Sequence, residues 1–191
     1  MTVKVITPPT TEPLSLEEAK QHLRIDGSED DSLILSLIKQ AREWCEDYQG
    51  KKYITQTLEL VLDLFPSDRQ IEFRNCSPIQ NVDSFKYTDK DGIVREFEGY
   101  IVDKDSFINR VVLNTSKYWP TTELMPVNGI RIQFIAGFGN ASAVPESIKW
   151  AMVAHMKILA DGVLISLKDG EKQKIESVRN SLLGMRRVIP V

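Results

Sequence analysis

The first fifty residues place apolar side chains with the period of an α-helix. The series Ser15-Leu16-Glu17-Glu18 has the form of a capping box, so it predicts a short helix that begins at Ser15 and ends near Arg24. A second apolar stripe recurs at every third or fourth residue and stops at Gly50, a residue type that commonly follows a helix. Its members are Ile34, Leu37, Ile38, Ala41, Trp44, Cys45 and Tyr48. The pattern thus predicts two amphipathic helices in succession.

The pattern changes at Tyr53 and stays different as far as Ala136. β-branched and aromatic residues become frequent there, and turn signals recur about every eight to twelve residues, which is typical of short antiparallel strands. The series Asp89-Lys90-Asp91-Gly92 predicts a hairpin turn, with Gly92 at a position that needs a positive φ. The predicted strands cover residues 57–64, 71–73, 82–88, 93–97, 110–113 and 129–136.

Helical periodicity returns after Gly139. Pro145 fits the first position of a helix, and Glu146 fits the first turn, where the helix dipole favours a negative charge. The helix predicted over 145–161 is apolar almost all round, so it must be covered on more than one side. A weaker helix follows, and its predicted inward side is formed by Ile175, Val178, Leu182 and Met185.

The order of these elements predicts an α+β fold. It consists of a small helical bundle, built from two N-terminal and two C-terminal helices, with an inserted antiparallel β subdomain. Residues 1–13 are rich in Pro and Thr and are expected to form an extended N-terminal arm. Residues 14–52 and 140–191 form the predicted helical core, and residues 53–139 form the insert. A chain of 191 residues can bury enough surface to fold without a metal or a disulfide.

The charge of the chain excludes some classes of protein. There are 24 Lys and Arg against 27 Asp and Glu, for a net charge of −3, which excludes a generally basic nucleic-acid coat. No apolar run approaches the ~18 residues of a membrane helix, and the N-terminus lacks a signal-peptide pattern. Residues 1–50 hold 5 basic and 10 acidic residues, whereas residues 141–191 hold 8 and 5. An acidic beginning and a basic end can attract each other within a subunit or between neighbours.

Few residues suggest catalysis. His155 lies on the apolar stripe of its helix, which favours a buried core or interface histidine, and His22 has no partner at the spacing of a zinc site. The series that begins at Asp89 lacks the acidic twelfth residue of a calcium loop, since that position is Tyr100. The two cysteines also lack metal-site spacing, and we expect free thiols. We therefore predict no catalytic residue, no metal site and no cofactor.

Two charged segments leave alternative functions open. The acidic residues at 26–31 fit a helix cap and a solvated loop. The alternative is a metal-dependent hydrolase or nuclease, whose cation would be bound by the carboxylates of Asp26, Asp30, Asp31 and Asp89. The basic segment near the C-terminus fits a solvated face, a contact with an acidic neighbouring subunit, or a non-specific DNA-binding module. Its residues are Lys168, Lys172, Lys174, Arg179, Arg186 and Arg187.

A series of segments, in this order, gives the chain a family resemblance. They are LSLEEAKQHLRIDG at 14–27, AREWCE at 41–46, ITQTLEL at 54–60, WP at 119–120, IQFIAGFG at 132–139 and VPESIK at 144–149. Together they resemble the head–tail connector (head-completion adaptor) family of tailed bacteriophages, in the variant with a β insert between the second and third helices. The resemblance extends from about residue 14 to about residue 160 and is looser beyond.

The resemblance implies a structural protein without enzymatic activity or cofactor. Members of the family form a ring beneath the portal protein and join the capsid vertex to the tail-completion, or stopper, proteins. DNA passes through the ring without being read. The protein would then come from a phage or a prophage. It would work in the bacterial cytoplasm during assembly and in the virion at the head–tail junction, with no membrane partner.

A ring requires heterologous contacts, in which one surface of a subunit meets a different surface of the next. We expect aromatic residues and a methionine of the helices to serve core or subunit packing. We expect the basic segment 168–174 to face residues 26–31 or 43–47 of a neighbour. The candidate interface residues are Trp44, Tyr48, Trp150, Met156, Lys172, Lys174, Asp30 and Asp31.

Overall fold

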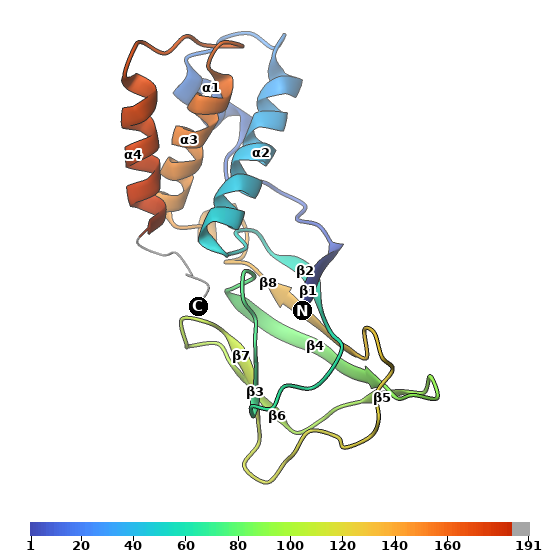
Figure 1. Ribbon diagram of the computed structural model, residues 1–191. Helices are drawn as coiled ribbons and strands as arrows, with labels where there is room; N and C mark the ends of the chain where they lie inside the picture. The colour runs from blue at the N-terminus through green and yellow to red at the C-terminus, as the bar shows by residue number, and fades with distance from the viewer. Residues whose placement is uncertain (185–191) are drawn as a thin grey trace. The chain divides into compact units, whose positions relative to one another are not determined.

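The computed structural model describes residues 1–184, so Met185, Arg186 and Arg187 of the predictions above lie outside the described residues. Contacts divide the chain into two compact units (Figure 1). The helical unit comprises Thr10–Ile54 and Phe138–Val191, and the β unit comprises Met1–Pro9 and Thr55–Gly137. Helices together with antiparallel sheets give the α+β class that the sequence predicts.

Among the described residues, four α-helices and a short 3-10 helix, Ala141–Ala143, form the helical unit. Two of the α-helices, α2 and α3, each contact all of the other three. All side chains of α3 from Ala151 to Met156 are buried, which confirms that this helix is covered on more than one side. None of the described helices is both long enough and apolar enough to cross a membrane. The helices are α1 Leu16–Leu23, α2 Asp31–Gln49, α3 Glu146–Ala160 and α4 Glu171–Gly184.

The predicted ends of α1 and α2 are confirmed. Ser15 Oγ accepts a hydrogen bond from the backbone N–H of Glu18 at 3.1 Å, and Glu18 Oε2 accepts one from the N–H of Ser15 at 2.8 Å, which completes the capping box. Gly50 follows α2 in the left-handed conformation, with φ at 65°. Asp30 takes the N-cap position of α2, but its side chain makes no capping hydrogen bond.

The inward side of α4 differs from the predicted one. Its buried residues are Arg179 and Leu183, whereas Val178 of the predicted stripe is 55% exposed. The guanidinium group of Arg179 lies over the ring of Trp44. Because of this contact, the buried residues of α4 are each one position beyond Val178 and Leu182 of the predicted stripe. The prediction that Arg179 belongs to a solvated basic face is therefore wrong.

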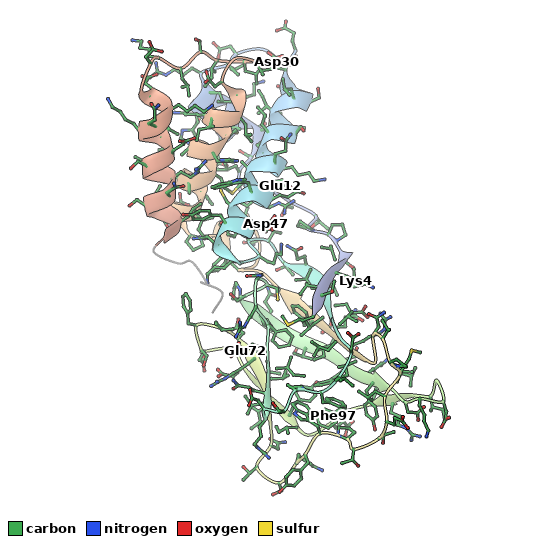
Figure 2. The ribbon with its side chains drawn as sticks, viewed as in Figure 1. Lys4, Glu12, Asp30, Asp47, Glu72 and Phe97 are labelled. Carbon is green, nitrogen blue, oxygen red and sulfur yellow. The ribbon has the colours of Figure 1, made fainter. Side chains whose placement is uncertain are left out.

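Two antiparallel sheets form the β unit. Five strands pair in the order β1-β2-β8-β4-β5, and three pair in the order β3-β7-β6. Leu58 of β2 stands opposite Phe134 of β8, and both are fully buried. Side chains of both sheets share one hydrophobic cluster, which includes Phe97 (Figure 2). The strands are β1 Thr2–Thr7, β2 Gln56–Leu62, β3 Gln70–Glu72, β4 Ile79–Thr88, β5 Val94–Glu96, β6 Tyr100–Asp103, β7 Arg110–Leu113 and β8 Ile130–Ala136.

The six predicted strands are present, β7 with the predicted ends and the other five with shifted ends, and two further strands, β1 and β6, were not predicted. The hairpin turn before Gly92 is confirmed, with φ at 82° for this glycine. Strand β1 lies in the segment predicted as an extended arm, and it pairs with β2 at the edge of the larger sheet. Only Val3 of β1 is partly buried, so the strand has no alternation of burial for a sequence pattern to record.

Candidate interface surfaces of the helical unit

Trp44 is the centre of a cluster that joins three helices. Its ring stacks on Tyr48 of α2 with 5.1 Å between ring centroids, and on His155 of α3 with 4.2 Å. The guanidinium carbon of Arg179, on α4, lies 4.0 Å from the centroid of a ring of Trp44. Arg179 also donates a hydrogen bond from Nη1 to Nδ1 of His155 over 2.8 Å. Two of the candidate interface residues, Trp44 and Tyr48, therefore pack within one subunit.

His155 is held neutral in this cluster. The residue is only 6% exposed, and burial together with the positive charge of Arg179 lowers the pKa of His155 to about 4. Because a guanidinium group only donates hydrogen bonds, Nδ1 of His155 is the acceptor and the ring proton lies on Nε2. The expectation of a buried histidine at this position is confirmed.

A second polar network fixes the start of the helical unit to α2. Arg42 is buried; it donates from Nε to Oε2 of Glu12 at 2.7 Å, and from Nη1 to Oε2 of Glu46 at 3.2 Å. The other carboxylate oxygen of Glu46 accepts a hydrogen bond from the backbone N–H of Tyr53 at 2.8 Å. Buried charges require such partners. Sequence reasoning missed the network because Glu12 and Tyr53 lie outside the helix that carries its other members.

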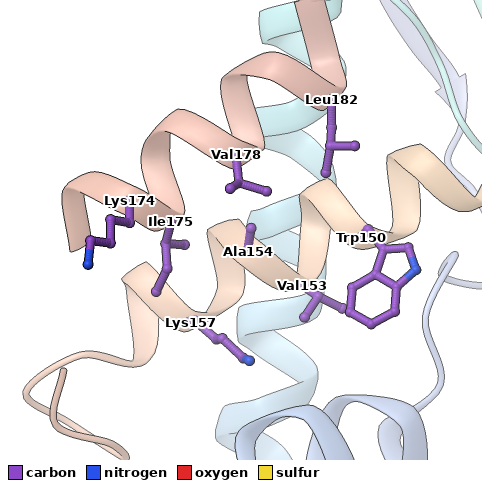
Figure 3. A pocket seen from close by; sticks show the side chains of 8 residues that line it. All are labelled: Trp150, Val153, Ala154, Lys157, Lys174, Ile175, Val178 and Leu182. Carbon is purple, nitrogen blue, oxygen red and sulfur yellow. The ribbon is translucent and has the colours of Figure 1, made fainter. Parts of the chain in front are cut away.

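An apolar groove with a volume of about 340 Å³ lies between α3 and α4 (Figure 3). Two lysines, Lys157 and Lys174, lie at one end, and Trp150 and Leu182 lie at the other. The ring of Trp150 contacts the ring of His22 of α1 at an interplanar angle of 66°, with 5.0 Å between ring centroids. The groove is lined by Trp150, Val153, Ala154, Lys157, Lys174, Ile175, Val178 and Leu182.

Four of the candidate interface residues lie on α3 and α4. Trp150 and Lys174 line the groove together, so the structure brings these two into one surface. Lys172 is exposed but is not part of the groove lining. Met156 is fully buried, so it packs in the core of the subunit and is not available to a neighbour.

The acidic segment before α2 is occupied by a lysine of the same chain. Lys20 Nζ lies 2.6 Å from Oδ1 of Asp31 and also donates to the backbone carbonyl of Gly27. In the β unit, Asp89 accepts a hydrogen bond from Nη2 of Arg95 at 3.1 Å. Among residues 1–184, no group of three or more His, Cys, Asp or Glu side chains is placed to hold a metal ion. A metal-dependent hydrolase or nuclease is therefore not supported.

The basic residues of the described part of the C-terminal segment do not form one exposed face. Arg179 is buried, and only Lys174 of the two lysines on α4 lines the groove. Arg186 and Arg187 lie outside the described residues. The alternative of a DNA-binding module on this segment is therefore not supported.

Comparison with known proteins gives one family and a group of solved structures. Residues 13–99 match the family described as phage gp6-like head-tail connector protein. Solved structures with the same fold include a chain from the neck of an empty GTA particle with C6 symmetry, at a TM-score of 0.78 and 20% identity. A chain from the virion of a native gene transfer agent (GTA) particle gives 0.77 and 19%. A chain from the neck of a native GTA particle with C12 symmetry gives 0.75 and 20%.

In all three comparisons, 100% of this chain and 97% of the other chain are covered. At these identities the likeness shows a common fold. No curated protein sequence gives a match. The family match covers α1, α2 and strands β2 to β5, and it includes the first three segments of the resemblance in the sequence. Residues 13–99 are therefore similar to the phage gp6-like head-tail connector family, in agreement with the resemblance found in the sequence.

Proposed function

We propose that the protein is a structural head–tail connector of a tailed phage, a prophage or a related particle, and that its copies form a ring. The observation that carries the proposal is a connector-family match in a chain whose whole length shares the fold of GTA neck chains. Two of those neck structures have C6 and C12 symmetry, which supports a ring.

The ring joins the portal protein at the capsid vertex to a tail-completion, or stopper, protein, and DNA passes through it as cargo. The subunits assemble in the bacterial cytoplasm and then remain in the virion at the head–tail junction. This function requires complementary surfaces and neither a reactive group nor a cofactor. The apolar groove between α3 and α4 supports the proposal because it is a surface suited to contact with another protein.

Unlike charges on the helical unit supply part of the contact between copies. Lys172 and Lys174 are exposed on α4, and Asp26 and Glu29 are exposed before α2. In a ring, one side of each copy faces the other side of the next, so the basic residues of one subunit can face the acidic residues of its neighbour.

Deletion of the gene from a phage or prophage that carries it tests the connector function. We expect DNA-filled heads and separate tails that do not join, as seen by electron microscopy. Expression of the wild-type protein in the same cells should restore tailed particles. Normal numbers of tailed particles without the protein would contradict the proposed function.

A further inference from the structure

Helix α4 buries little of its own surface. Of its 14 residues only Arg179 and Leu183 are buried, and the first of these carries a charge. Val178, which lines the groove, is 55% exposed (Figure 3). Burial of apolar surface is the main source of stability for a packed helix. The packing of α4 is therefore weaker than that of α3, in which every side chain from Ala151 to Met156 is buried.

A few polar contacts attach α4 to the other helices. Arg179 lies over the ring of Trp44 and donates a hydrogen bond to His155. Gln49 donates to the backbone carbonyl of Leu183 at 2.8 Å. A hydrogen bond within a protein replaces one to water, so its net contribution to stability is modest. These contacts fix the position of α4 but add little to the free energy that holds it there.

The connection between α3 and α4 carries a glycine near each end. Gly162 and Gly170 both have φ at 78°, in the left-handed region. Open space surrounds the position that a Cβ atom of Gly162 would take. Glycine changes its backbone conformation at low steric cost. Helix α4 can therefore move on this connection without distorting α3.

The part of α2 that faces α4 includes a native thiol. Cys45 is fully buried and lies one helical turn before Gln49, on the same side of α2. Burial raises the pKa of the Cys45 thiol to about 12, and the positive charge of Arg179 opposes this rise, so Arg179 lies near the thiol. The ring of Trp44 lies under the same guanidinium group. Departure of α4 therefore uncovers both Trp44 and Cys45.

We propose that α4 is a strap over this face of α2 and α3, and that it opens as one unit while the rest of the helical unit stays folded. Segments with few buried apolar contacts open at a lower free energy than the whole protein unfolds. The closed strap covers apolar surface of a single subunit, and the open strap presents that surface to a partner. The inference concerns one subunit, so it is tested separately from the ring of the proposed function.

Hydrogen exchange of the backbone amides, measured by mass spectrometry, tests the opening. The amides of residues 171–184 should exchange together and faster than those of α2, because a helix of this length is marginal once it leaves its neighbours. Leu183→Ala removes the buried apolar side chain of α4, so it should speed this exchange about thirtyfold or more.

Ile34→Ala is the matched control, since Ile34 in α2 is as fully buried as Leu183. It weakens the rest of the unit but not the attachment of α4, so it should speed exchange in α2 and leave exchange in α4 unchanged. Ile34→Val gives the same comparison with a smaller loss of stability, should Ile34→Ala not fold. Exchange in α4 that is accelerated equally by the variants at Leu183 and Ile34 would mean that α4 opens only when the whole unit unfolds, and would overturn the proposal.

Reaction of the native thiols with a maleimide tests whether the strap covers α2. Cys45 and Cys76 are both buried, and Cys76 belongs to the β unit, so it serves as the control within the same molecule. Leu183→Ala should speed the modification of Cys45 by the same factor as the exchange in α4, and by far more than the modification of Cys76. Equal gains for the two thiols would mean unfolding of the whole chain. Faster exchange in α4 without faster modification of Cys45 would mean a helix that unfolds in place, and either result would overturn the strap.

Discussion

Trp44, His155 and Arg179 come from three different helices and meet in one cluster, in which His155 and Arg179 are buried and Trp44 is partly buried. The hydrogen bond between Arg179 and His155 requires a neutral imidazole, because protonation would leave two positive groups 2.8 Å apart. The side chains that hold α4 to the rest of the helical unit therefore include a group that titrates between neutral and acidic pH.

We predict that the protein loses stability as the pH falls below about 6.5, and that His155→Gln reduces this loss. Folding lowers the pKa of His155 from 6.5 to about 4. Between these values the unfolded chain binds a proton that the folded chain does not, so the free energy of unfolding falls as the pH falls. Above pH 6.5 the contribution of the neutral imidazole is complete.

Urea unfolding of wild type and His155→Gln at about pH 7 and about pH 5 measures this effect, with circular dichroism as the signal. Glutamine keeps an acceptor for Arg179 but does not titrate. Between about pH 7 and about pH 9 both proteins should respond alike, since the imidazole is neutral there. An equal loss between pH 7 and pH 5 in the two proteins would contradict the assignment.

Gln49 bridges α2 to α4. It is fully buried, its Nε2 donates to the backbone carbonyl of Leu183 at 2.8 Å, and its Oε1 accepts from the hydroxyl of Tyr53 at 2.8 Å. Gln49→Leu leaves both partners buried without this hydrogen bond, so we predict a loss of about 2–5 kcal/mol in the free energy of unfolding. The control is Gln40→Leu on the exposed side of α2, with an expected change within about 0.5 kcal/mol. Similar losses from the two variants would exclude the bridge.

At the scale of elements, the features that the sequence predicts are those with a local cause. The capping box of α1 depends on Ser15 and Glu18, three residues apart, and α2 ends at Gly50 because glycine adopts the left-handed conformation easily. Periodicity likewise indicates the covered helix α3. These predictions need no knowledge of the rest of the fold.

Tertiary contacts decide the features that the sequence does not predict. The buried side of α4 depends on the contact of Arg179 with Trp44, and that contact leaves Val178 in the wall of an open groove. Of the candidate interface residues, Trp150 and Lys174 both line this groove, at opposite ends, whereas Met156 is in the core. Spacing alone predicts an apolar stripe on a helix and does not show which part of the stripe a subunit covers.

Ser15→Ala tests the local part of this account. The change removes the hydroxyl that accepts the N–H of Glu18, so we predict a loss of about 1 kcal/mol in the free energy of unfolding. Ser36→Ala in the exposed middle of α2 is the control, and it should be neutral or slightly stabilising, because alanine favours helices. Urea unfolding followed by the helical signal measures both. A larger loss from Ser36→Ala than from Ser15→Ala would contradict the prediction.

At the scale of the whole molecule, the uneven charge of the chain should make assembly depend on salt. We predict that Lys172→Glu with Lys174→Glu weakens association between copies, and that the difference from wild type shrinks as salt screens the charges. Lys104→Glu, an exposed lysine of the β unit, is the control. Sedimentation at low and high ionic strength measures association. An oligomer size unchanged by the double reversal at any ionic strength would exclude these lysines from the contact.

The ring itself is the central claim, and the mass of the purified protein tests it most directly. Light scattering from a concentrated sample, with negative-stain images of the same sample, should give a mass that is a whole multiple of the 21.7 kDa chain and closed particles with a central opening. A mass that stays at that of one chain over the whole concentration range, with no closed particles in the images, would contradict the account.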